Sequence, residues 1–140
     1  MRHLRLAAAT TLLAAGLAAC SDSTSPADLA GTYDVTVFEF TNADNTTEKV
    51  DVVDLGAAIE ITITAGGAFT IDVDGETETG TIEIDGSDVT VTIGGDPATG
   101  TINQNGSTVT LNFDTGTEFD FDEDGTDDPA TLRVVMTLQT

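Results

Sequence analysis

Residues 79–93 read TGTIEIDGSDVTVTI, and this stretch decides the fold class. On both sides of a central Asp85-Gly86, apolar and polar residues alternate with a period of two. Successive side chains of a β-strand point to opposite faces, so the alternation predicts two strands that each bury one face. The stretch therefore predicts an antiparallel hairpin.

Turn sequences set the expected pairing of the hairpins. Asp85-Gly86 and Asn105-Gly106 suit two-residue type I′ loops, in which both central residues need a positive φ. Ala65-Gly66-Gly67 suits a three-residue loop, because a two-residue loop would place isoleucine opposite threonine. The predicted opposite pairs are Ile82 with Val89, Gly80 with Val91, Ile102 with Val109, Gly100 with Leu111, Ile63 with Phe69, Ile61 with Ile71 and Ile59 with Val73.

The same pattern recurs along the chain. Thr-Gly-Thr-Ile occurs at residues 79–82 and again at residues 99–102, and no segment after residue 31 has helical spacing. One hairpin per twenty residues predicts an antiparallel up-and-down meander, which protects its edge strands most simply by closing. We therefore expect an all-β domain that closes into a small barrel. An antiparallel β-sandwich is the alternative, since its sequence pattern would look nearly the same.

A short motif at the head of the first predicted strand supports the barrel. Gly31-Thr32-Tyr33 resembles the Gly-x-aromatic start of lipocalin-like domains, with tyrosine in place of the usual tryptophan. The resemblance covers about residues 29–139. Arg133 comes early in the last strand, whereas the arginine that packs over the aromatic residue in this family comes at the end. The resemblance implies an eight-stranded barrel whose interior is filled by side chains or holds one small ligand.

The alternation also predicts which side chains point into the barrel. Valine, isoleucine, leucine and phenylalanine make up the expected inward set. In the first strand we expect Tyr33, Val35 and Val37 to point inward, and we expect Gly80 and Gly100 to leave room. A small apolar pocket is therefore permitted by the sequence.

The first twenty residues have the features of an export signal. A short basic start precedes an apolar run at residues 4–17, which is shorter than the roughly 18 residues that span a bilayer. The ending Leu17-Ala18-Ala19-Cys20 resembles the lipobox of bacterial lipoproteins, in which the cysteine becomes the lipidated N-terminus. The resemblance implies a signal peptide at residues 1–19, a lipid anchor on Cys20, a flexible tether at residues 20–28 and a domain at residues 29–140. We expect this domain to face the periplasm or the exterior, with the outer membrane favoured over the inner membrane.

The composition excludes several classes of function. The chain has 25 acidic and four basic side chains and a formal net charge of −21, so nucleic acid is not an expected partner. The only histidine, His3, lies in the leader, and the only cysteine is Cys20. The domain therefore lacks the residues of a Ser-His-Asp or Cys-His catalytic apparatus and of a histidine or thiolate zinc site. A carboxylate pair acting on a glycoside is the remaining enzymatic alternative, and we expect no enzyme.

One loop carries residues with metal chemistry. Residues 120–128 read DFDEDGTDD, which resembles the calcium loop of EF-hand-like repeats. Carboxylates at alternate positions followed by a glycine can surround one Ca²⁺ with oxygen atoms. The candidate ligands are Asp120, Asp122, Asp124, Thr126 through its carbonyl, and Asp128, whereas Thr131 stands where the bidentate glutamate would be. The alternative is a solvated acidic turn with Phe119 and Phe121 pointing inward.

Two hypotheses for function follow. The first is a membrane-anchored lipoprotein with a non-enzymatic lipocalin-like domain that binds a small apolar ligand. The second is an acidic, calcium-stabilised module for protein interaction or envelope structure, with an envelope protein as its partner. An enclosed apolar cavity would favour the first hypothesis, and a filled core would favour the second.

Overall fold

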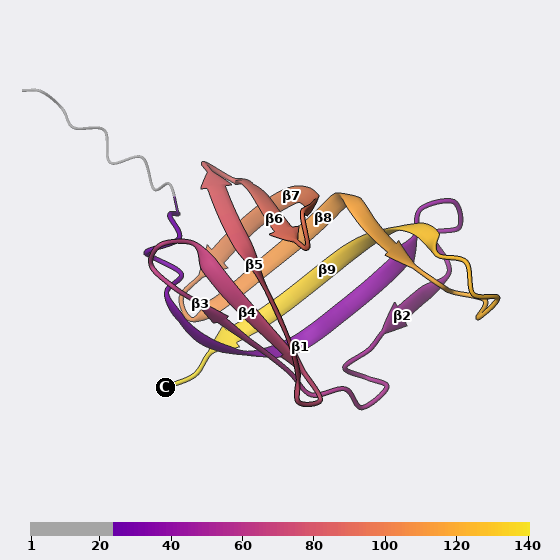
Figure 1. Ribbon diagram of the computed structural model, residues 1–140, viewed down its shortest axis with the longest axis horizontal. Coiled ribbons are helices and arrows are strands. Elements are labelled where there is room, and N and C mark those ends of the chain that lie inside the picture. The colour runs from indigo at the N-terminus through magenta and orange to yellow at the C-terminus, as the bar shows by residue number, and fades with distance from the viewer. Residues whose placement is uncertain (1–23) are drawn as a thin grey trace, which may run out of the picture.

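The computed structural model describes residues 24–140, and these residues form strands and turns without a helix (Figure 1). The predicted signal peptide at residues 1–19 and the predicted lipidation site, Cys20, lie outside the described residues. The strands are β1 (Gly31–Asn42), β2 (Lys49–Asp51), β3 (Ile59–Ile63), β4 (Ala68–Val73), β5 (Glu76–Asp85), β6 (Asp88–Ile93), β7 (Asp96–Asn105), β8 (Thr108–Phe119) and β9 (Asp128–Leu138).

The strands form a closed antiparallel barrel with meander topology. The ring contains eight strands, β1 and β3 to β9, and the pairing of β1 with β9 closes it. The short β2 pairs with the second half of β1, at Glu39 to Thr41, while the first four residues of β1 pair with β3. All nine strands belong to one sheet that closes on itself. The predicted fold class is confirmed, and the β-sandwich is not the architecture.

The predicted three-residue loop is confirmed, and the two predicted two-residue loops are wrong by one position. Around Ala65-Gly66-Gly67 the pairs are Ile63 with Phe69, Ile61 with Ile71 and Ile59 with Val73. The other loops are Gly86-Ser87 and Gly106-Ser107, flanked by paired strand residues. The observed pairs are therefore Ile82 with Val91, Gly80 with Ile93, Ile102 with Leu111, and Gly100 with Phe113.

Turn chemistry explains this difference. Gly86, at φ 64°, and Gly106, at φ 62°, take the first loop position, where a type II′ turn needs glycine. Asp85 and Asn105 stay in their strands and avoid the positive φ that a type I′ loop would impose on them. The shift moves each pair by two residues, and a shift of two keeps every side chain on its predicted face.

A β-bulge in β1 changes one predicted face. The register between β1 and β9 shifts between Val35 and Val37. The extra residue of a bulge reverses the alternation beyond it, and the inward face of β1 continues at Phe38 and Phe40. The prediction that Val37 points inward is therefore wrong.

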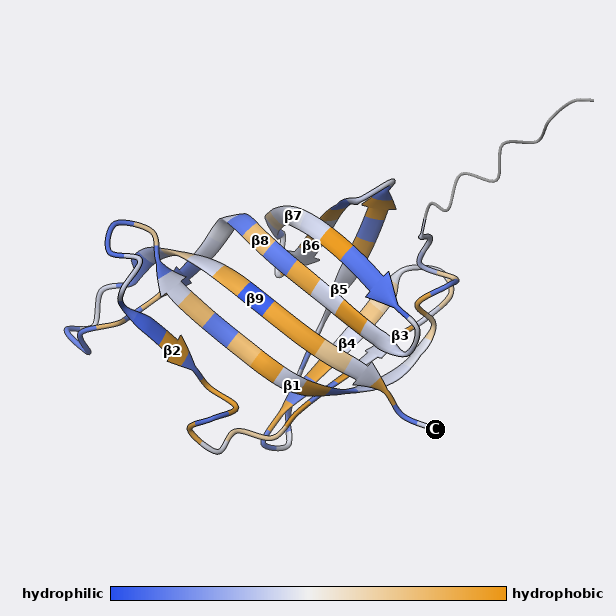
Figure 2. Cartoon of the chain, turned by 180° about the vertical axis from the view of Figure 1, so that it is seen from behind, coloured by the Kyte–Doolittle hydropathy of each residue, from blue (hydrophilic) through white to orange (hydrophobic). Residues whose placement is uncertain are grey.

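The inner surface of the barrel is apolar along most of its length. When the chain is coloured by hydropathy, orange bands alternate with blue or white ones along β1 and β8, and β9 shows one blue band within a mostly orange stretch (Figure 2). Valine, isoleucine, leucine and phenylalanine dominate the buried set, as predicted from the alternation. The largest fully buried side chains are those of Tyr33, Leu29, Met136, Val89 and Val109.

One end of the barrel is closed by the segment that precedes β1. Leu29 is 0% exposed, and its carbonyl accepts a hydrogen bond of 2.9 Å from the Tyr33 hydroxyl. Burial raises the pKa of Tyr33. In the preceding turn the Asp28 carboxylate accepts hydrogen bonds from the hydroxyl and the backbone N–H of Ser25, which lower the pKa of Asp28. This end also carries the β3–β4, β5–β6 and β7–β8 loops.

The opposite end is extended on one side. There β1, β8 and β9 continue past the strands of the opposite wall, and β2 adds to the free edge of β1 (Figure 1). The register between β8 and β9 shifts between Phe113 and Thr117, and β8 no longer pairs with β7 beyond Thr115. The acidic segment at residues 120–127 connects β8 to β9 at the tip of this extension.

Candidate functional site

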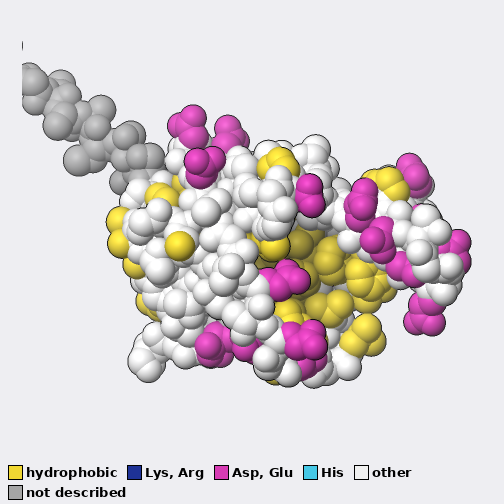
Figure 3. Space-filling model, in the orientation of Figure 1, with side chains coloured by type: hydrophobic (Ala, Val, Ile, Leu, Met, Phe, Trp, Pro, Cys, Tyr) yellow, Lys and Arg dark blue, Asp and Glu magenta, His cyan; other side chains and the backbone are white. Residues whose placement is uncertain are grey.

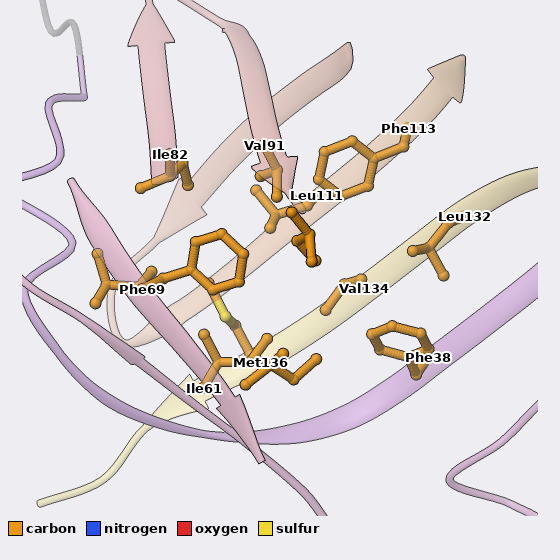
Figure 4. A pocket seen from close by; sticks show the side chains of 13 residues that line it. Phe38, Ile61, Phe69, Ile82, Val91, Leu111, Phe113, Leu132, Val134 and Met136 are labelled. Atoms are coloured by element: carbon orange, nitrogen blue, oxygen red, sulfur yellow. The ribbon is translucent and has the colours of Figure 1, made fainter. Parts of the chain in front are cut away.

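A cavity of about 80 Å³ lies inside the barrel, and every side chain that lines it is apolar. The lining residues come from seven of the eight barrel strands and point toward a common space (Figure 4). They are Phe38, Ile61, Ile63, Phe69, Ile71, Ile82, Val91, Ile93, Leu111, Phe113, Leu132, Val134 and Met136. A cavity without polar groups cannot hold water well, because water needs two to four polar partners. The interior therefore favours an apolar occupant.

The two inward glycines do not create this cavity. A Cβ on Gly80 would lie 2.7 Å from an atom of the Phe69 ring, so that ring already covers the glycine. A Cβ on Gly100 would lie 1.8 Å from the carbonyl oxygen of Asn112, so the backbone of β8 lies against it. The prediction that these glycines leave room for a pocket is wrong. The space lies between the larger side chains.

A second space of about 260 Å³ forms the mouth of the cavity at the extended end of the barrel. It is lined by Phe38, Ile71, Val73, Glu76, Glu78 and Ile93. Phe38, Ile71 and Ile93 also line the inner cavity, so the two spaces adjoin. In the space-filling view, a hollow with a hydrophobic floor faces the viewer, and acidic side chains stand around it (Figure 3).

The two carboxylates at the mouth come from the regular alternation of β5. Glu78 lies opposite Ile71 and Glu76 lies opposite Val73, on the same face as Ile82 further along the strand. The inward face of β5 thus changes from apolar inside the barrel to acidic at the mouth. Within residues 24–140, no hydrogen bond or ion pair engages either glutamate side chain, and both residues are exposed.

The sequence interpretation missed these two residues, although a signal was present. Once Ile82 is placed inward, counting back along β5 in steps of two reaches Glu78 and Glu76. The predicted strand began later, because the apolar alternation that identified it starts at Ile82. A prediction that locates a strand by its apolar residues alone misses the end of the strand where the inward residues are polar.

Phe38 lies at the boundary between the inner cavity and the mouth, at the point where β1 leaves β3 and begins to pair with β2. Its backbone N–H donates a hydrogen bond of 3.1 Å to Asp51 Oδ1, and its carbonyl accepts one of 3.1 Å from the Val52 N–H. Asp51 Oδ1 also accepts a hydrogen bond of 3.0 Å from the Val53 N–H. These bonds satisfy the backbone polar groups at the branch point and fix the position of the Phe38 main chain.

A row of four half-buried phenylalanine rings leads outward from Phe38. The centroid of its ring lies 5.5 Å from that of Phe40 in an edge-to-face arrangement. Phe40 stacks on Phe119 at 4.7 Å, and Phe119 meets Phe121 edge-on at 5.0 Å. Aromatic pairs in these geometries add to the stability gained by burial. The row covers the inner face of the extension between the mouth and the acidic loop.

The acidic loop brings together three of the five predicted calcium ligands. Carboxylate oxygens of Asp120, Asp122 and Asp124 lie within 4.8 Å of one another. Backbone N–H groups of residues 124–126 donate hydrogen bonds of 2.8–3.2 Å to these carboxylates, and Gly125 has a φ of 87°. Thr126 is one of these donors, and Asp128 is outside the carboxylate group because it begins β9 opposite Phe119. The loop therefore matches the predicted calcium loop at its first three ligand positions, Asp120, Asp122 and Asp124.

Arg133 does not reach the aromatic residue of the lipocalin-like motif. It is exposed on the outer face of β9, opposite Glu39 of β1, while Tyr33 lies opposite Leu138 near the closed end. The tyrosine hydroxyl is instead satisfied by the Leu29 carbonyl.

The comparisons with known proteins do not assign the chain to a family. No family model matches the sequence, and no curated protein matches it significantly. The part of the chain from residue 24 onward contains no helix long and apolar enough to cross a membrane.

Proposed function

We propose that this protein is a membrane-anchored, non-enzymatic binding protein that holds a small apolar ligand in its barrel. The observation that carries the proposal is the cavity of about 80 Å³, which is lined only by apolar side chains and adjoins a mouth of about 260 Å³. Small-molecule sites are concave and mostly apolar with a few polar groups, and the cavity with its mouth has this composition. The hollow interior favours ligand binding over the alternative of an acidic interaction module with a filled core.

Membrane attachment is the second part of the proposal, and its support is the sequence alone. The Leu17-Ala18-Ala19-Cys20 motif supports lipidation of Cys20 in the bacterial envelope. More than one acyl chain is needed for stable anchoring, and lipoprotein-type modification supplies it. We expect the full chain to fractionate with membranes and Cys20→Ala to lose this association. Recovery of Cys20→Ala in the membrane fraction would contradict the anchor.

Ligand binding is tested by calorimetric titration of residues 24–140 with 1-octanol, a neutral single-chain probe. We expect saturable binding of one molecule per barrel. Val91→Phe places a larger side chain into the cavity and should weaken binding at least about tenfold, whereas Thr92→Phe on the outer face of β6 should leave it unchanged. A thermal melt of each variant shows that it folds. Equal affinity of the two variants, or no saturable binding to the parent protein, would contradict the proposal.

A further inference from the structure

The mouth of the barrel combines three features that select a ligand by its charge. Its charged lining groups are the carboxylates of Glu76 and Glu78, its floor is apolar, and one wall is the Phe38 ring. Neither glutamate has a counter-charge among residues 24–140. The mouth therefore presents negative charge at the entrance of an apolar space.

The basic side chains of the domain do not offset this charge. Residues 24–140 contain two basic residues, Lys49 and Arg133. The Lys49 Nζ lies 3.4 Å from a carboxylate oxygen of Glu39, and Arg133 is exposed on the outer face of β9. Neither residue lines the mouth or the cavity. An anionic headgroup, such as that of a fatty acid, would be repelled there, because like charges at short range raise the free energy of binding.

The Phe38 ring adds a second attraction for positive charge. It belongs to both the mouth and the inner cavity, and its centroid lies 5.5 Å from that of the neighbouring Phe40 ring in an edge-to-face arrangement. The face of an aromatic ring attracts cations, and quaternary ammonium groups are recognised in proteins by aromatic side chains. A cation at the mouth could therefore contact both the ring and the two carboxylates.

We propose that the ligand of this barrel is a cationic amphiphile, with an amine or quaternary ammonium headgroup at Glu76, Glu78 and Phe38 and a single hydrocarbon chain in the cavity. This inference rests on the proposed function and names the chemical class of its ligand. The inner space limits the size of the chain. A dry cavity of roughly 150 Å³ binds benzene, so a cavity of about 80 Å³ admits only the end of one chain and excludes fused rings.

The test compares three probes that share one chain length and differ in headgroup charge: octyltrimethylammonium, 1-octanol and octyl sulfate. Each is titrated calorimetrically below its micelle concentration into residues 24–140. We expect octyltrimethylammonium to bind with a Kd at least about tenfold lower than that of 1-octanol, and octyl sulfate to bind more weakly than both. The preference should shrink as salt is raised, because the carboxylates are solvent-exposed.

Matched variants separate the mouth from the overall acidity of the protein. The double change Glu76→Gln and Glu78→Gln removes two charges at the mouth, whereas Glu83→Gln with Asp85→Asn removes two charges from the outer face of the same strand. The first variant should lose most of the preference for octyltrimethylammonium over 1-octanol, and the second should keep it. Phe38→Leu keeps an apolar wall without the ring and should reduce the preference about threefold.

The outcomes distinguish the two proposals. If 1-octanol binds and octyltrimethylammonium binds no more tightly, the cationic headgroup is wrong and the apolar site stands. If the two double variants lose the preference equally, the attraction comes from net charge and the mouth is not the site. If 1-octanol does not bind saturably, the proposed function itself fails, even where octyltrimethylammonium binds through its charge.

Discussion

The two ends of the barrel are built from the same strands and differ in what their inward positions carry. At the closed end the inward residues are large and apolar, Leu29 is fully buried, and the Tyr33 hydroxyl is paired with a backbone carbonyl. At the open end the inward face of β5 carries Glu78 and Glu76, whose side chains form no hydrogen bond or ion pair within residues 24–140. We therefore expect the buried contacts of the closed end to contribute more to stability than the exposed carboxylates of the open end, which are available to a ligand. The following predictions test this division, from the largest expected effect to the smallest.

Truncation at the closed end should cost the most stability. Leu29→Ala removes a fully buried side chain and leaves a cavity, so we expect the free energy of unfolding to fall by about 2–5 kcal/mol. Urea titration measures this change. Leu55, which is 77% exposed, is the matched control, and Leu55→Ala should change stability by less than about 0.5 kcal/mol. Similar losses in the two variants would show that the segment before β1 does not close the barrel.

Calcium should act on the open end. The resemblance of residues 120–128 to a calcium loop predicts binding of modest affinity, with a Kd of about 0.1–1 mM, as in extracellular modules. At 10 mM Ca²⁺ the free energy of unfolding would then rise by roughly 1.4–2.7 kcal/mol. Thermal melting with and without Ca²⁺, with Mg²⁺ as the control, measures the effect. An unchanged midpoint, or an equal rise in Asp120→Asn with Asp124→Asn, would leave the loop as a solvated acidic turn.

The Tyr33 hydroxyl should contribute a smaller, pH-dependent part of the stability. Tyr33→Phe removes its hydrogen bond to the Leu29 carbonyl and should cost about 1–2 kcal/mol at neutral pH. Burial raises the pKa of Tyr33 in the folded protein above the ordinary value of 10.0. Above pH 10 the unfolded chain therefore ionises first, and stability should fall as pH rises further.

Urea titrations from pH 8 to pH 11.5 compare the parent protein with Tyr33→Phe. The parent should lose stability above about pH 10, and the variant should lose less. Parallel curves would mean that Tyr33 does not titrate differently in the folded and unfolded states. Tyr33 is the only tyrosine in the chain, so no other phenol contributes to the difference.

Removal of the mouth carboxylates should change stability least. Glu76→Gln with Glu78→Gln deletes two exposed charges that make no hydrogen bond or ion pair with the described part of the chain, so we expect a change within about 0.5 kcal/mol. Urea titration of this double variant beside Leu29→Ala compares the two ends directly. A loss of more than about 2 kcal/mol would place these glutamates in the structural framework and not in a binding surface.

Much of the fold could be predicted from the sequence, because alternation carries most of the information. The alternation on either side of Asp85-Gly86 predicted the strands, and the twenty-residue repeat predicted a closed meander. The alternation could not position the loops at Gly86-Ser87 and Gly106-Ser107, since a shift of the strand pairing by two residues leaves the hydrophobic faces unchanged. The bulge after Val35 was missed because one extra residue reverses the pattern without changing its composition.

The candidate site was less predictable than the fold. The sequence permitted a cavity, but whether a barrel is hollow depends on how side chains such as Phe69 and Phe113 fill the space, which no periodicity specifies. Glu76 and Glu78 could have been found by extending the face of Ile82 backward along β5. Phe38 could not have been found in this way, because its side chain points inward only as a result of the bulge in β1.

The central claim is that the hydrocarbon chain of a cationic ligand enters the barrel at its open end. Intermolecular nuclear Overhauser effects between octyltrimethylammonium and methyl-labelled protein test it most directly. We expect contacts from the chain terminus to the methyl groups of Val91 and Val134 and from the headgroup to the Phe38 ring. Contacts confined to Val135, on the outer face of β9, or no contacts with the cavity methyl groups at saturation, would contradict the account.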